Sequence, residues 1–158
     1  MKIMRNSVLI TSAALLACTL AMPLGAKDKK QVMLPIKGAG VMTVHYTPIS
    51  PTTAFFHNEE DGHMTFAGLY HNVGDGTTDF STGATLTGSG TVTAANGDTI
   101  HWVLDSGSRY LVVGGTGRFE NASGDMTWTL LSKSDPVFFR DGTFEVTILA
   151  AYEGEVTF

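Results

Sequence analysis

The sequence predicts an all-β fold: a single antiparallel β-barrel of about eight strands, preceded by an N-terminal signal peptide. Three observations support this prediction. After residue 26, stretches rich in β-branched and aromatic residues recur at intervals of about 8–12 residues, with glycine turns between them. No stretch beyond that point carries apolar residues at helical spacing. The glycines can mark bends and bulges, and repeated bends favour a sheet that curls and closes over a flat sandwich.

Residues 1–26 have the three parts of a secretion signal. Lys2 and Arg5 form a positive start, Val8–Leu20 is apolar, and Ala26 precedes a polar run and marks the expected cleavage site. The apolar segment is too short for a standard membrane span. The sequence therefore predicts a mature barrel of residues 27–158 that is periplasmic or secreted and not inserted in a membrane.

The single cysteine leaves an alternative open. Leu15-Leu-Ala-Cys18 resembles a bacterial lipobox, in which case the protein would be a lipoprotein anchored through Cys18. Cleavage after Ala26 would instead leave no cysteine, which excludes disulfides, thiol catalysis and cysteine metal sites from the mature chain.

The charge balance limits the classes of partner. The formal net charge is −5, and loss of the signal removes two cations and no acid. An acidic chain without a basic patch cannot neutralise many phosphates, which argues against nucleic acid. Binding to anionic membrane surfaces is disfavoured for the same reason.

The first half of the mature chain divides at its prolines and turn-rich stretches. Asn58–Gly62 consists of residues that favour turns, and Asn72–Thr78 contains two glycines and predicts a loop. The expected strands are Gln31–Ile36, Val41–Tyr46, Thr52–His57 and His63–His71.

A central hairpin is predicted where Asn96-Gly97 separates Thr85–Ala95 from Thr99–Leu104. Asn-Gly suits a two-residue type I′ turn, which needs positive φ at both positions. That loop would place Thr91 opposite Trp102, whereas a loop one residue longer would exchange the faces. The side chains expected to point inward, because they carry the larger apolar area, are Ile100, Trp102 and Leu104.

The second half continues the strand pattern. Gly114–Gly124 is expected to be a long glycine-rich connection with Phe119 tucked under it. The last strand alternates apolar residues on one face with mixed residues on the other. The expected strands are Arg109–Val113, Asp125–Ser132, Val137–Phe139 and Thr143–Tyr152.

Two motifs in order resemble a known family. Thr91-Val-Thr-Ala-Ala-Asn-Gly-Asp-Thr99, followed by Gly114-Gly-Thr-Gly-Arg-Phe-Glu-Asn-Ala-Ser-Gly124, is similar to bacterial secreted proteins with an allene oxide cyclase-like or dirigent-like barrel. The resemblance is strongest over Gly88–Trp128. It implies an eight-stranded barrel whose cavity accepts apolar molecules, and a homo-oligomer is a further expectation. Plant relatives direct cyclisation or radical coupling by holding the substrate in one conformation; none of their catalytic residues matches a position here.

Candidate pocket residues are the large aromatics of the expected barrel, together with Arg109 as the only cation of the core hairpin region. Aromatic side chains can line a site for a lipophilic ligand, or they can simply fill the barrel. We expect packing at one end and an opening at the other. The aromatic candidates are Trp102, Tyr110, Trp128, Phe144 and Tyr152.

Other motifs fail on inspection. Gly114–Gly117 is followed by Arg118-Phe119, not by the Lys-Ser/Thr of a phosphate loop. The spacing of His57, His63 and His71 matches no established ligand motif, so no metal and no cofactor are predicted. His101 and Asp105 would form an acid/base pair only if they faced inward. No catalytic residue is identified.

Two functions remain open from the sequence. The first is an exported barrel that binds a small apolar molecule and steers a cyclisation or coupling by shape. The alternative is a non-catalytic envelope or secreted barrel that acts through protein interaction. A cavity lined by aromatic residues would favour the first, and an exposed apolar outer patch would favour the second.

Overall fold

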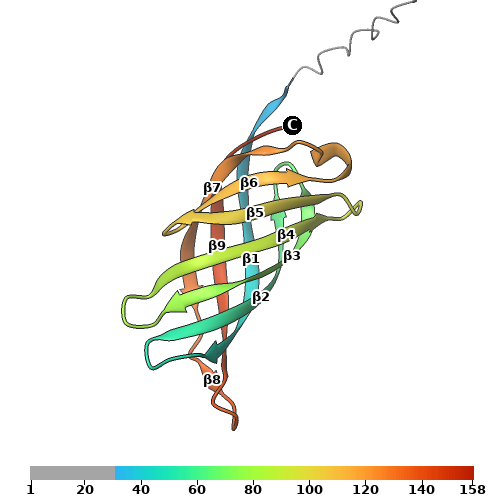
Figure 1. Ribbon diagram of the computed structural model, residues 1–158. Helices are drawn as coiled ribbons and strands as arrows, with labels where there is room; N and C mark the ends of the chain where they lie inside the picture. The colour runs from blue at the N-terminus through green and yellow to red at the C-terminus, as the bar shows by residue number, and fades with distance from the viewer. Residues whose placement is uncertain (1–30) are drawn as a thin grey trace, which may run out of the picture. The chain divides into compact units, whose positions relative to one another are not determined.

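The computed structural model describes residues 31–158, which form one antiparallel sheet closed into a barrel (Figure 1). Neighbouring strands pair in the order β1-β2-β3-β4-β5-β6-β7-β9, and β1 pairs with β9 to close the ring. The short strand β8 adds to β9 only. The strands are β1 (Met33–Pro48), β2 (Thr53–Met64), β3 (Gly68–Asp79), β4 (Ala84–Ala94), β5 (Thr99–Ser106), β6 (Arg109–Gly115), β7 (Ser123–Lys133), β8 (Val137–Phe138) and β9 (Phe144–Thr157).

The predicted all-β antiparallel barrel is therefore confirmed, with one strand beyond the eight that close it. The expected signal peptide, including Cys18, lies outside the described residues. Within residues 31–158, no helix is long and apolar enough to span a membrane.

Alternation along the strands places the core inside the ring. On β9, Val146, Ile148, Ala150 and Tyr152 are all buried and face inward, as their sequence spacing predicts. Because successive side chains of a strand point to opposite faces, the residues between them face outward. The interior of the barrel is therefore the hydrophobic core.

One end of the barrel is filled. The connection between β6 and β7 contains a short 3₁₀ helix, η1 (Gly117–Phe119), and the Phe119 side chain is fully buried. Phe66 meets the Phe119 ring edge-on at 5.8 Å, and the guanidinium of Arg118 lies 4.5 Å from its centroid. The expectation that Phe119 tucks under this connection is confirmed.

The opposite end is less tightly packed. Tyr46, Phe56 and Phe144 are only partly buried there, with Tyr46 stacked on Phe144 at 4.8 Å and edge-on to Phe56 at 6.4 Å. The barrel is thus packed at one end, as expected, and is lined by half-buried aromatic rings at the other, where an opening was expected.

The predicted division of the first half was wrong in β1, where the expected strands Gln31–Ile36 and Val41–Tyr46 form one continuous strand, and around β2 and β3. Asn58–Gly62 lies within β2, Asn72–Thr78 lies within β3, and the turn falls at residues 65–67, inside the strand expected at His63–His71. Turn-favouring residues are tolerated in these strands because several of their side chains face the interior. Inside the barrel, Glu60 and Asn72 form hydrogen bonds. The glycines of β3 leave room for aromatic rings, as described below.

The register of the central hairpin was also wrong. Ala94 N–H bonds to the carbonyl of Asp98 at 2.9 Å, and Gly97 N–H bonds to that of Ala94 at 2.9 Å, so the loop has one residue more than a type I′ turn. Gly97 has φ of 87°, whereas Asn96 is not in the left-handed region. Trp102 therefore lies opposite Gly90 and not Thr91. Ile100 and Trp102 nevertheless face inward, as predicted, and both are buried.

Candidate functional site

The interior holds a cavity between the filled end and the aromatic end. The space open to the centre of a water molecule is about 80 Å³. Aliphatic and aromatic side chains form most of its wall, and a few polar side chains from β2 and β3 reach it. Four of the sequence-predicted pocket residues line it: Trp102, Tyr110, Trp128 and Tyr152.

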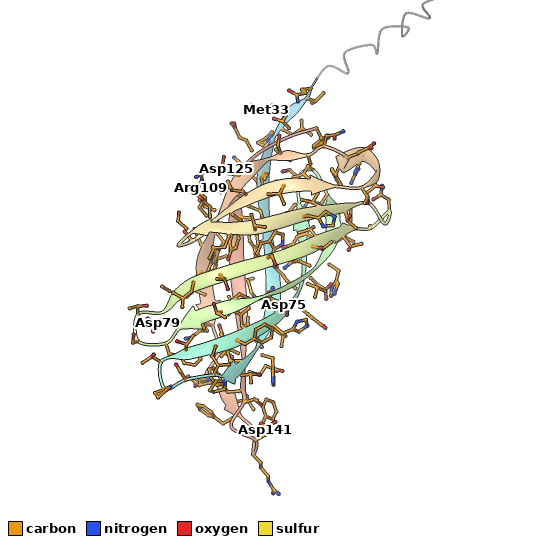
Figure 2. The ribbon with its side chains drawn as sticks, viewed as in Figure 1. Met33, Asp75, Asp79, Arg109, Asp125 and Asp141 are labelled. Carbon is orange, nitrogen blue, oxygen red and sulfur yellow. The ribbon has the colours of Figure 1, made fainter. Side chains whose placement is uncertain are left out.

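Two other predicted pocket residues lie elsewhere. Phe144 packs behind Tyr46 at the less filled end and is not part of the cavity wall. Arg109 lies on the outer surface, where it pairs with Asp105 at 2.8 Å and with Asp125 at 3.3 Å (Figure 2). Its placement in the pocket was therefore wrong, because the cation is held outside by two exposed carboxylates.

A buried carboxyl group is the main polar feature of the cavity. Glu60 on β2 is only 3% exposed. The hydroxyl of Tyr70 donates to its Oε1 at 2.7 Å, and the hydroxyl of Tyr152 donates to its Oε2 at 2.8 Å. Strands β3 and β9 thus each contribute one tyrosine that fixes the carboxyl group in place.

The surroundings of Glu60 shift its ionisation. Burial raises the pKa of Glu60, while the hydrogen bonds from Tyr70, Tyr152 and Asn72 oppose part of that rise. Burial, together with the negative charge of Glu60, also raises the pKa of Tyr110 to about 12. A buried carboxyl group with a raised pKa beside a cavity is suited to proton transfer as well as to binding.

A second buried contact orients the aromatic wall. The indole N–H of Trp102 donates to Oδ1 of Asn72 at 2.8 Å, and both residues are buried. This bond joins β5 to β3 across β4 and holds the ring flat against the inner face. The Trp102 ring also meets Tyr110 edge-on at 4.8 Å.

Glycines in the wall make space for the Trp102 ring. A Cβ at Gly74 would lie 2.7 Å from Cζ2 of Trp102, and a Cβ at Gly90 would lie 2.5 Å from the same atom. Only a residue without a side chain fits at such a distance. These glycines therefore set the position of the ring, a role different from the bends that the sequence suggested.

Two polar atoms in the cavity wall have no hydrogen-bond partner among the described residues. They are Oδ1 of Asn58, an acceptor, and Nε1 of Trp128, a donor. Nε1 of Trp128 lies near the Tyr110 hydroxyl, and this proximity opposes part of the rise in the pKa of Tyr110. The contact lacks the geometry of a regular hydrogen bond, so Nε1 counts as unpaired. Because unpaired buried polar atoms are unfavourable, a bound molecule that paired with them would gain affinity.

Sequence reasoning missed Asn58, Glu60 and Asn72. The first two were assigned to a turn and the third to a loop, because their residue types favour such structures. The sequence did indicate the position of Asn58 and Glu60, because Phe56, Asn58 and Glu60 are spaced two residues apart and therefore share one face of a strand. The inward face of this strand was missed because it carries polar as well as apolar residues.

The outer face of β2 and β3 carries the three histidines whose spacing was considered for a metal site, His57, His63 and His71. His57 Nδ1 lies 2.8 Å from Oδ1 of Asp75, and His71 Nδ1 lies 2.9 Å from Oδ1 of Asp61. Within residues 31–158, no group of three or more His, Asp or Glu side chains is arranged to hold a metal ion. His101 and Asp105 are also on the outside, so they form no acid/base pair in the cavity.

Comparison with known proteins finds similarity among solved structures. Neither a family model nor a curated protein matches the chain. The chain is similar to the structure of the pterocarpan synthase dirigent protein GePTS1, at 13% sequence identity and a TM-score of 0.42, over 82% of this chain and 88% of that chain. The barrel itself is defined independently, by the pairing of β1 with β9.

Proposed function

We propose that this protein is an exported barrel that binds one small, largely apolar molecule in its interior. The observation that carries the proposal is the interior cavity, whose aromatic and aliphatic wall surrounds a fixed carboxyl group. Small-molecule sites typically combine an apolar wall with a few placed polar groups. An eight-stranded barrel has an interior wide enough for one small ligand.

Confinement in such a cavity would steer a cyclisation or coupling of the bound molecule by shape. Holding a substrate in one reactive conformation lowers the barrier without a conventional catalytic motif. Glu60 would add a proton donor or acceptor at a fixed position. The resemblance of residues 88–128 to allene oxide cyclase-like and dirigent-like barrels implies the same kind of role.

Native mass spectrometry of the protein, purified without unfolding from the cells that make it, tests the binding function. The proposal predicts an added mass of a small organic molecule that is released on denaturation. Val92→Phe, which fills the cavity, should abolish the added mass. Val113→Phe, at an exposed position on the outer face of β6, should retain it. A bare chain in every sample would contradict the proposal.

A second candidate function is interaction with another protein chain through the β8 hairpin. Val137 and Phe138 are 59% and 71% exposed, and β8 has only β9 as a neighbour in the described sheet. An exposed apolar edge strand is a typical site of pairing with another chain. Self-association that is lost in Phe138→Ser, measured by analytical ultracentrifugation, would support this function.

A further inference from the structure

The cavity offers hydrogen-bond acceptors, one unpaired N–H donor on Trp128 and aromatic rings, but no positive charge. Glu60 and Asn58 follow each other on the inner face of β2, and both are at least 95% buried. The carboxyl oxygens of Glu60 each accept one tyrosine hydroxyl, and Oδ1 of Asn58 accepts nothing. Among the described residues, those that line the cavity include no lysine, arginine or histidine.

A buried carboxylate is unfavourable unless a positive charge or several hydrogen-bond donors compensate for its lost hydration. Two tyrosine hydroxyls and the side chain of Asn72 supply part of that compensation here. A ligand with an ammonium group would supply the rest, because such a group carries a positive charge and several N–H donors. One of those donors would also pair with the free oxygen of Asn58.

The aromatic wall suits the same ligand. Trp102, Tyr110 and Trp128 line the cavity with Glu60, and the faces of aromatic rings attract cations. The net charge of −5 also raises the concentration of cations near the protein. The available space of about 80 Å³ limits the apolar body of the ligand to roughly a single ring.

We propose that the cavity binds a small hydrophobic amine in its protonated form, with the ammonium group on Glu60 and Asn58 and the apolar body against the aromatic wall. This inference rests on the proposed function, because it names the class of ligand for the same cavity.

The ionisation of Glu60 gives the proposal a pH signature. Burial raises the pKa of Glu60, and the charge of Asp61, on the outer face of β2, adds to the rise. The other titratable groups facing it are Tyr70 from β3, Tyr152 from β9 and Tyr110 from β6, whose pKa values are all raised, so they stay neutral at neutral pH. A bound ammonium lowers the pKa of Glu60 again, so amine binding weakens as pH falls and the carboxyl group gains a proton.

Isothermal titration calorimetry with benzylamine, which is protonated at neutral pH, and with its neutral analogue benzyl alcohol tests the inference. The intact barrel should bind benzylammonium at least about ten-fold more tightly than benzyl alcohol. Glu60→Gln should remove that preference. Glu59→Gln, which removes an exposed carboxylate from the outer face of the same strand, should retain it. Equal affinity for the two compounds, or a preference that survives in Glu60→Gln, would overturn the inference.

A measurement on the unchanged protein covers the case in which Glu60→Gln does not fold. The affinity for benzylammonium should fall as pH is lowered through the raised pKa of Glu60, while the affinity for benzyl alcohol stays constant. A pH-independent ratio of the two affinities would contradict the amine. Binding of benzyl alcohol without a preference for the amine contradicts this inference alone, whereas failure of both compounds to bind also contradicts the proposed function.

Discussion

Tyr152 on β9 and Glu60 on β2 are joined by a 2.8 Å hydrogen bond inside the barrel, although β1 lies between their strands. Tyr70 completes the arrangement from β3. The carboxyl group is therefore held from two sides. This fixed group distinguishes the cavity from an ordinary apolar core.

The raised pKa of Glu60 predicts how stability depends on pH. The unfolded chain loses the proton of this carboxyl group at lower pH than the folded chain does. The free energy of unfolding of the parent should therefore fall, relative to that of Glu60→Gln, as pH rises from the ordinary glutamate pKa toward the raised one. The slope is at most about 1.4 kcal/mol per pH unit.

Urea unfolding at a series of pH values measures this difference. Below the ordinary glutamate pKa the carboxyl group is protonated in both states, and the difference should no longer change with pH. A constant difference between the parent and Glu60→Gln would show that Glu60 ionises normally in the folded state.

Gly90→Ala should destabilise the barrel because the added Cβ would lie 2.5 Å from Trp102 and also meet the backbone of Val73. Overpacking of this kind typically lowers the free energy of unfolding by about 1–3 kcal/mol. Gly88→Ala is the matched control on the same strand, since its Cβ would meet its nearest neighbours at 3.6 Å, an ordinary contact. Equal effects of the two substitutions in thermal unfolding would rule out the proposed fit around Trp102.

Phe119→Ala should open the filled end of the barrel. The Phe119 side chain is fully buried, and its loss should lower the free energy of unfolding by about 3–5 kcal/mol. Phe138→Ala removes a ring that is 71% exposed and should change stability by less than about 0.5 kcal/mol. Chemical denaturation of both variants gives the comparison, and a small effect at Phe119 would mean that this end is not part of the core.

The N–H groups of the two tryptophans should differ in their contribution to the free energy of unfolding. Trp102→Phe leaves the carboxamide oxygen of Asn72 without its donor, whereas Trp128→Phe removes an N–H that has no partner. Loss of one partner of a buried hydrogen bond destabilises by about 1–3 kcal/mol. We expect Trp102→Phe to lower the unfolding free energy by about that much more than Trp128→Phe, and the reverse order would contradict the assigned contacts.

The sequence was informative where burial depends on apolar residues alone. The alternation on β9 and the inward positions of Ile100 and Trp102 could be read directly, because each strand exposes one face to the core. The burial of Phe119 under the glycine-rich connection was also predictable. Closure was predicted only in general terms, from the repeated glycine bends and from the family resemblance, and the pairing of β1 with β9 was not predicted.

The polar part of the site could not be read in the same way. Glu60 is buried because tyrosines 10 and 92 positions away along the chain donate to it, and such contacts exist only after the barrel has formed. The hairpin register depended on whether Asn96 adopts positive φ, and one residue of loop length exchanged the expected faces of β4. Arg109 was misplaced because its partner Asp125 lies on a different strand.

The central claim is that the barrel interior takes up a small ligand, and the chain's two tryptophans provide the most direct test. Both indole groups line the cavity, so each gives an NMR signal that reports on it. Titration with ethylbenzene should shift the indole N–H signals of Trp102 and Trp128 together and to saturation, with little change at Val137 and Phe138 on the exposed hairpin. Unchanged indole signals, or shifts confined to the hairpin, would contradict the claim.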